Sequence, residues 1–164
     1  MRRLFLTLAP VAVIAIAVTG CGGTSKKSGS QSTAPATTSN ARAATVDVRK
    51  TGLGTILVDA TGRTLYLFEK DKGDKSSCAG ACASAWPPVI TTAKPKAGAG
   101  VTAAKLGTTK RGDGTTEATY NGHPLYTYAG DARPGDTAGE GLNQFGAEWY
   151  ALSPHGSKVE KKGS

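Results

Sequence analysis

The sequence predicts a small, mainly β domain of antiparallel strands, built from two pseudo-equivalent repeats and containing one short helix at most. Residues 62–71 and 122–131 align at a constant offset of 60, with identical Gly, Leu, Tyr and Asp residues at matched positions. In both halves, short runs rich in β-branched and aromatic residues lie between turn signals, and each half ends in a segment that contains a tryptophan. We therefore expect one duplicated domain at residues 45–156, with repeats at about residues 53–90 and 106–156.

The first half is expected to form a β-hairpin followed by the short helix. Residues 55–58 and 64–68 are β-branched, apolar or aromatic, and the Thr-Gly pair at 61–62 marks the turn between them. The second of these strands is apolar on both faces, so we expect it to be central. The helix is expected around residues 78–86, because the two prolines that follow would end it.

The second half repeats the hairpin and adds a last strand. Residues 115–120 and 125–128 flank an Asn-Gly pair, which is the strongest short-range hairpin signal because both residues tolerate a positive φ. The last strand is expected at residues 149–152. The two halves should therefore have similar local structure.

Both repeats carry the pattern Tyr-x-aromatic-x-x-Asp, formed by Tyr66, Phe68 and Asp71 and by Tyr126, Tyr128 and Asp131. The two aromatic residues of each pattern share a strand face, and we expect them to pack the halves together rather than form a platform for a carbohydrate or other ligand. Each aspartate is expected to cap a loop by accepting backbone N–H bonds, in preference to a Ca²⁺ site. Any of the six that remain exposed are the expected contact surface for a partner.

These motifs, together with the segments CAGACASAWPP and YNGHPLY, resemble a family of predicted bacterial lipoproteins called the secreted repeat of unknown function. The resemblance covers about residues 54–156 and therefore nearly all of the expected domain. It implies a location in the cell envelope and a duplicated motif. It implies no established reaction.

Residues 1–20 have the pattern of an export signal. Two arginines precede an apolar run of 15 residues, which would rise only about 22 Å as a helix, against roughly 30 Å for a bilayer core. The run ends in Val-Thr-Gly-Cys, which resembles a lipobox and implies that Cys21 becomes the lipidated first residue, with a palmitate-type anchor in the cell membrane. The alternative is an ordinary signal peptide with a chance cysteine. Export by the general or the twin-arginine route stays open.

Low-complexity segments flank the expected domain. Residues 22–44 contain no aromatic residue and no Leu, Ile or Val, which predicts a disordered spacer from Cys21 that spans on the order of 26 Å. Residues 157–164 are expected to form a basic, disordered tail. The chain has a formal net charge of +8, but residues 45–156 hold 12 basic and 11 acidic residues, so no nucleic-acid partner is expected. The expected partners are the membrane and an unidentified cell-wall or protein component.

Cys78 and Cys82 are predicted to form a disulfide, because the protein is exported and a four-residue separation brings their Cα atoms to about 6 Å. So short a loop should stabilise its own segment rather than the whole fold. The alternative is a redox or metal-handling protein that uses both thiols, with His123 as a further ligand.

The sequence favours a binding or envelope-organising role over catalysis. It contains no G-x-S-x-G nucleophile motif and no phosphate-binding loop. We therefore predict no catalytic residue, no metal site and no cofactor, and a lipid-anchored protein on the extracytoplasmic face of the cell membrane.

Overall fold

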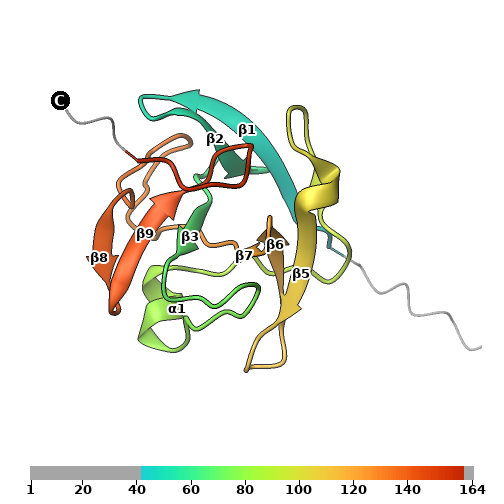
Figure 1. Ribbon diagram of the computed structural model, residues 1–164, viewed down its shortest axis with the longest axis vertical. Coiled ribbons are helices and arrows are strands. Elements are labelled where there is room, and N and C mark those ends of the chain that lie inside the picture. Colours follow the sequence, from blue (N-terminus) through green and yellow to red (C-terminus); the bar gives the residue numbers. More distant parts are fainter. Residues whose placement is uncertain (1–41, 161–164) are drawn as a thin grey trace, which may run out of the picture. The chain divides into compact units, whose positions relative to one another are not determined.

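The structure, a computed structural model, describes residues 42–160. This part of the chain contains three small β-sheets (Figure 1). The predicted export signal, the lipidation site at Cys21, most of the spacer and the end of the tail lie outside these residues. Within residues 42–160, no helix is long and apolar enough to cross a bilayer. The mainly β, antiparallel fold class is confirmed.

The first sheet is a long hairpin with a short parallel addition. Its strands are β1 (Thr45–Thr51), β2 (Gly54–Asp59) and β4 (Lys96–Ala97), in the order β2-β1-β4. The sequence analysis missed β1, because only Val46 and Val48 carry its apolar alternation before Arg49 and Lys50 turn to solvent. β2 is the predicted strand at residues 55–58, one residue longer at each end.

The other two sheets contain the predicted strands at residues 64–68, 115–120 and 149–152, in part or in full. One has the order β3-β9-β8, with β3 (Tyr66–Phe68), β9 (Ala147–Ala151) and β8 (Leu142–Gln144). The other has the order β5-β6-β7, with β5 (Leu106–Lys110), β6 (Thr116–Tyr120) and β7 (His123–Pro124). The helices are α1 (Ala81–Ala85) and a 3-10 turn at Ala103–Lys105.

The predicted strand at residues 125–128 is wrong as a continuous strand. β7 ends at Pro124, and Tyr126 forms isolated bridges with Tyr66 and Pro88 instead. The ladder with β6 ends after two residue pairs, because the Ala118 N–H donates to the Val89 carbonyl (2.9 Å) and not to Leu125.

Three backbone hydrogen bonds close a triangle in the first half. Leu57 N–H donates to the Leu152 carbonyl (N···O 2.7 Å), Leu152 N–H to Leu65 (3.1 Å), and Leu65 N–H to Leu57 (3.0 Å). Leu57 and Leu65 belong to the first repeat, whereas Leu152 follows β9 at the end of the second. Figure 1 shows the corresponding placement of β9 beside β3.

The second half has the same triangle with the repeats exchanged. Ala118 N–H donates to the Val89 carbonyl (2.9 Å), Val89 N–H to Leu125 (2.8 Å), and Leu125 N–H to Ala118 (3.0 Å). Val89 follows the tryptophan segment of the first repeat. Each tryptophan segment therefore completes the hairpin of the other repeat, and the two halves are interlocked.

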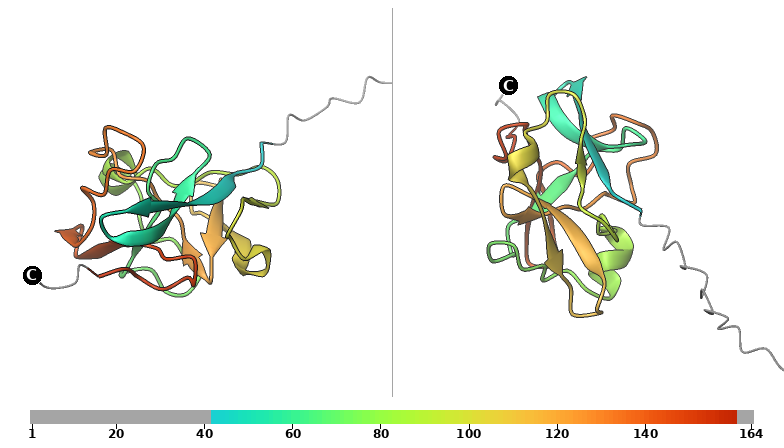
Figure 2. Two further views of the ribbon diagram at one scale, coloured as in Figure 1. Left: turned by 90° about the horizontal axis from the view of Figure 1, so that it is seen from above. Right: turned by 90° about the vertical axis from the view of Figure 1, so that its right-hand side faces the viewer.

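The core consists of an aromatic and an aliphatic cluster, which lie on opposite faces of β3. Tyr66 and Phe68 belong to the aromatic cluster, and Leu65 and Leu67 to the aliphatic one, as the strand alternation predicts. Figure 2 shows the same fold from two further sides, with the β1–β2 hairpin and the β5–β6 pair on different sides of the domain.

The ordered domain extends beyond its predicted limits of 45 and 156. Before β1, the Ala44 N–H donates to Thr91 Oγ1 (3.1 Å). After β9, the Val159 N–H donates to the Ala151 carbonyl (2.8 Å), and Lys158 Nζ lies 2.9 Å from Glu69 Oε1. The prediction of disorder is therefore wrong for residues 42–44 and 157–160, which hydrogen bonds hold against the domain.

Candidate functional site

The duplicated motifs form two crossed tyrosine–aspartate pairs. Tyr66 Oη donates to Asp131 Oδ2 (2.8 Å), and Tyr126 Oη donates to Asp71 Oδ2 (2.8 Å). Each tyrosine therefore binds the aspartate of the other repeat. Both tyrosines are fully buried, and this burial, with the nearby carboxylates, raises the pKa of each phenol far above its usual range. The two hydroxyls are permanent hydrogen-bond donors.

The second oxygen of each aspartate caps a loop, as predicted. Asp71 Oδ1 accepts the backbone N–H and the hydroxyl of Ser77 (2.7 Å each). Asp131 Oδ1 accepts the N–H of Ala138 (2.9 Å). Each carboxylate thus joins a loop of its own repeat to the tyrosine of the other.

The motif aromatics close the two ends of a stack. Trp86 and Trp149 lie parallel at its centre, with ring centroids 4.0 Å apart and planes 5° from parallel. Phe68 stacks on Trp149 (4.0 Å), and Tyr128 covers Trp86 (4.3 Å). The prediction that these aromatics pack the halves together is confirmed.

Tyr66, Phe68, Tyr126 and Asp131 are buried, so these four residues are not available for the predicted contact surface, which stays a prediction for the other two. Asp71 and Tyr128 are half-buried. Most motif residues therefore stabilise the packing of the two repeats against each other.

Removing either motif hydroxyl should destabilise the fold. Tyr66→Phe and Tyr126→Phe each leave an aspartate oxygen without its donor, and each should lower the free energy of unfolding by about 1.5–3 kcal/mol. Tyr150→Phe is the matched control, because its hydroxyl binds Glu148 on a half-exposed strand and its loss should cost less than about 0.5 kcal/mol. Denaturant titration measures all three; equal losses would contradict a special role for the motif.

The disulfide between Cys78 and Cys82 is confirmed, with Cα atoms 5.3 Å apart. Both residues are buried and pack in the aromatic cluster beside Trp86. The paired sulfurs provide no thiolate for the redox or metal-handling alternative.

Replacing both cysteines by alanine should leave the fold intact. A loop this short restricts the unfolded chain little, so we expect a loss of about 2 kcal/mol in the free energy of unfolding and an unchanged circular dichroism spectrum. An unfolded double variant would contradict a local role for the bond.

A buried ion pair, which the sequence analysis missed, lies beside the Tyr126–Asp71 pair. Arg111 Nη1 donates to Glu117 Oε2 (2.7 Å) and to Ser76 Oγ (2.7 Å), and Arg111 Nη2 donates to the Cys78 carbonyl (2.6 Å). Ser76 Oγ also lies 2.7 Å from Tyr126 Oη. Nothing in the sequence distinguishes Arg111 and Glu117 from the solvated charges near other turns.

The carboxylate of Glu117 is fully buried and only half satisfied. Its Oε1 has no hydrogen-bond partner among residues 42–160. Burial raises the pKa of Glu117 to about 7, against the opposing effect of Arg111. Burial lowers the pKa of Arg111, but the hydrogen bond and charge of Glu117 raise it overall, so the guanidinium stays charged.

A cavity of about 380 Å³ opens beside His123, where the first motif reaches the surface. Its lining residues are Leu67, Phe68, Glu69, Asp71, His123 and Lys158. His123 is half-buried, and burial lowers its pKa although Asp71 opposes the shift, so its imidazole is neutral at neutral pH. Within the described chain, no three His, Cys, Asp or Glu side chains gather as a metal site would require.

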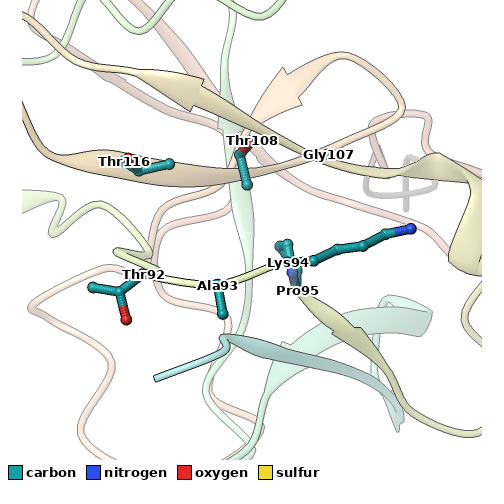
Figure 3. Close-up of a pocket in the computed structure, with 7 residues that line it drawn as sticks. All are labelled: Thr92, Ala93, Lys94, Pro95, Gly107, Thr108 and Thr116. Atoms are coloured by element: carbon teal, nitrogen blue, oxygen red, sulfur yellow. The ribbon is translucent and has the colours of Figure 1, made fainter. Parts of the chain in front are cut away.

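A second cavity, of about 270 Å³, lies between residues 92–95 and the β5–β6 pair (Figure 3). Thr92, Thr108 and Thr116 line it, and Figure 3 shows the Lys94 side chain extending away from these threonines. It contains no motif residue. The cavity beside His123 is the better candidate, because it joins a motif aspartate to a neutral, half-buried imidazole.

A family model described as a secreted repeat of unknown function matches the chain twice, at residues 47–90 and 107–153. The two matches correspond to the two interlocked repeats. Nothing among the curated proteins or the solved structures matches the chain.

Proposed function

We propose that this chain, which belongs to the family of secreted repeats of unknown function, is an extracytoplasmic lipoprotein. Its proposed role is binding or organisation of the cell envelope. A lipid on Cys21 would hold the duplicated β domain at the outer face of the cell membrane. The proposed lipid anchor is supported by the position of Cys21, which directly follows an apolar leader too short to span a bilayer.

The use of the motif residues supports binding over catalysis. The tyrosine hydroxyls, which could otherwise serve as acids or nucleophiles, are buried donors in internal hydrogen bonds. The result is a rigid scaffold with a surface cavity beside one motif aspartate. A preformed cavity on a rigid scaffold suits recognition of a ligand. The Cys78–Cys82 disulfide argues against a thiol-based activity.

Metabolic labelling tests the anchor. The full chain is expressed in a bacterial host with an alkyne analogue of palmitate, and we expect labelled protein in the membrane fraction. Cys21→Ser should abolish the label and the membrane association, whereas the Cys78→Ser/Cys82→Ser control keeps Cys21 and should keep both. Unlabelled wild-type protein in the soluble fraction would overturn the proposal in favour of an ordinary export signal.

A further inference from the structure

Arg63 and His123 occupy the same position in the two repeats. Their offset is 60, and each follows a glycine with a positive φ, 84° at Gly62 and 81° at Gly122. Arg63 lies beside Tyr128 of the second motif, and His123 lies beside Phe68 and Asp71 of the first. Like the motif tyrosines, each residue therefore contacts the other repeat. The two repeats can therefore be compared residue by residue at this point.

In one half, the chain supplies a cation to this position. Arg63 Nη2 donates to the Tyr128 carbonyl (2.6 Å), and its charge acts on the neighbouring Asp131. The same carbonyl accepts the N–H of Asp131 (3.2 Å). The guanidinium therefore fills the space beside the second motif.

In the other half, the position holds His123, which is shorter and uncharged. Its imidazole makes no hydrogen bond to a described residue, and the 380 Å³ cavity occupies the space in front of it. The Phe68 carbonyl accepts the N–H of Asp71 (3.1 Å), as Tyr128 accepts that of Asp131, but no described side chain donates to it. The first motif thus has the acceptors of the second without its internal donor.

The charge of the cavity favours a cation. Glu69 stands where the other repeat has Ala129, so the cavity has two carboxylates, Glu69 and Asp71. Lys158 Nζ, at the rim, lies 2.9 Å from Glu69 and 3.0 Å from Glu160. Glu69 therefore already accommodates an ammonium group. Asp71, whose oxygens accept hydrogen bonds from Tyr126 and Ser77, adds a second negative charge to the lining.

We propose that this cavity binds an organic cation with a guanidinium or primary ammonium group, in the place that Arg63 takes in the other half. This inference rests on the binding role proposed above and names its ligand class. The N–H donors would reach the Phe68 carbonyl, and Glu69 and Asp71 would supply the opposite charge. The neutral imidazole of His123 would leave room without repelling the ligand.

Titration of the exported chain, purified with whatever lipid it carries, tests the proposal. The probes are N-acetyl-arginine amide, cadaverine, and two matched controls. N-acetyl-citrulline amide has the shape of the arginine probe without its charge, and tetramethylammonium has the charge without N–H donors. Calorimetry should give binding of the first two that is at least tenfold tighter than that of the controls. Equal binding of arginine and citrulline probes would overturn the proposal.

Variants locate the site. His123→Arg should fill the cavity from within and abolish probe binding. Glu69→Gln changes an exposed side chain and should weaken binding severalfold. Arg63→His should open a second, weaker site, because that half has Ala129 in place of Glu69. Binding that none of these variants alters would overturn the assignment.

Two further probes identify the source of the cation. Tighter binding of acetyl-Gly-Arg-Gly amide than of arginine amide would support a polypeptide side chain, and tighter binding of cadaverine would support a free amine. If no cation binds, this inference fails, whereas the proposed lipoprotein role fails only if Cys21 carries no label.

Discussion

Replacing Arg111 by Met is expected to lower the free energy of unfolding by about 3–5 kcal/mol at about pH 8, because it removes the counter-charge of a fully buried carboxylate. The substitution also removes the donors to Ser76 Oγ and to the Cys78 carbonyl. Denaturant unfolding followed by circular dichroism measures the change. Lys110→Met is the matched control, because this exposed neighbour should contribute less than about 0.5 kcal/mol.

The loss should depend on pH, because Glu117 titrates within the folded state. Its pKa rises from 4.5 to about 7, so between these values the folded protein binds a proton that the unfolded chain has released. The resulting stability is fully present below about pH 4.5 and is lost as the pH rises through about 7. Its magnitude is on the order of 3 kcal/mol.

At about pH 5, Glu117 is protonated, and Arg111→Met should then cost less than at pH 8. Glu117→Gln, which keeps an acceptor for Arg111 but has no charge, should flatten the pH dependence of wild-type stability. A loss that is below about 1 kcal/mol at every pH would mean that water reaches the carboxylate, against its burial.

Trp149→Ala is expected to remove about 3–5 kcal/mol, because it leaves a large cavity at the centre of the aromatic stack. Trp149 contacts Phe68 and Trp86 face to face, and its indole N–H donates to the Gln144 carbonyl (3.1 Å). Phe145→Ala on the same hairpin is the control, because this side chain is 42% exposed and its truncation should cost less than about 0.5 kcal/mol. Comparable losses for the two would contradict the central place of the stack.

Local patterns predicted the parts of the fold that local interactions determine. The β-branched runs located β2 and β6, and strand alternation placed Tyr66 and Leu65 in different clusters. The separation of Cys78 and Cys82 predicted their disulfide. In each case the residues that decide the structure lie within a few positions of one another.

The crossing of the repeats could not be predicted in this way. An offset of 60 is the same whether the repeats pack side by side or exchange their tryptophan segments. The exchange is decided by long-range hydrogen bonds, such as that from Leu57 to Leu152. The burial of Arg111 and Glu117 has the same origin, because their charges become a core ion pair only when the first repeat covers them.

The cavity beside His123 could be predicted from the sequence only in part. The offset of 60 pairs His123 with Arg63, but the sequence analysis considered His123 only as a further metal ligand. The meaning of this pairing depends on the space around the side chain, which no spacing in the sequence reports. The structure shows that space and identifies the Tyr128 carbonyl as the acceptor of Arg63 in the other half.

The interlocked triangles bear on the ancestry of the chain. A single repeat has a hairpin without its third segment and a tryptophan segment without its hairpin, so one copy alone cannot close its own core. Two identical copies related by a two-fold axis would satisfy each other, because each would lend the segment that the other lacks. The present chain has the arrangement of such a symmetric dimer after gene duplication and fusion. In a fused chain the two copies can differ, and they do at the equivalent positions 63 and 123, which hold an arginine and a histidine.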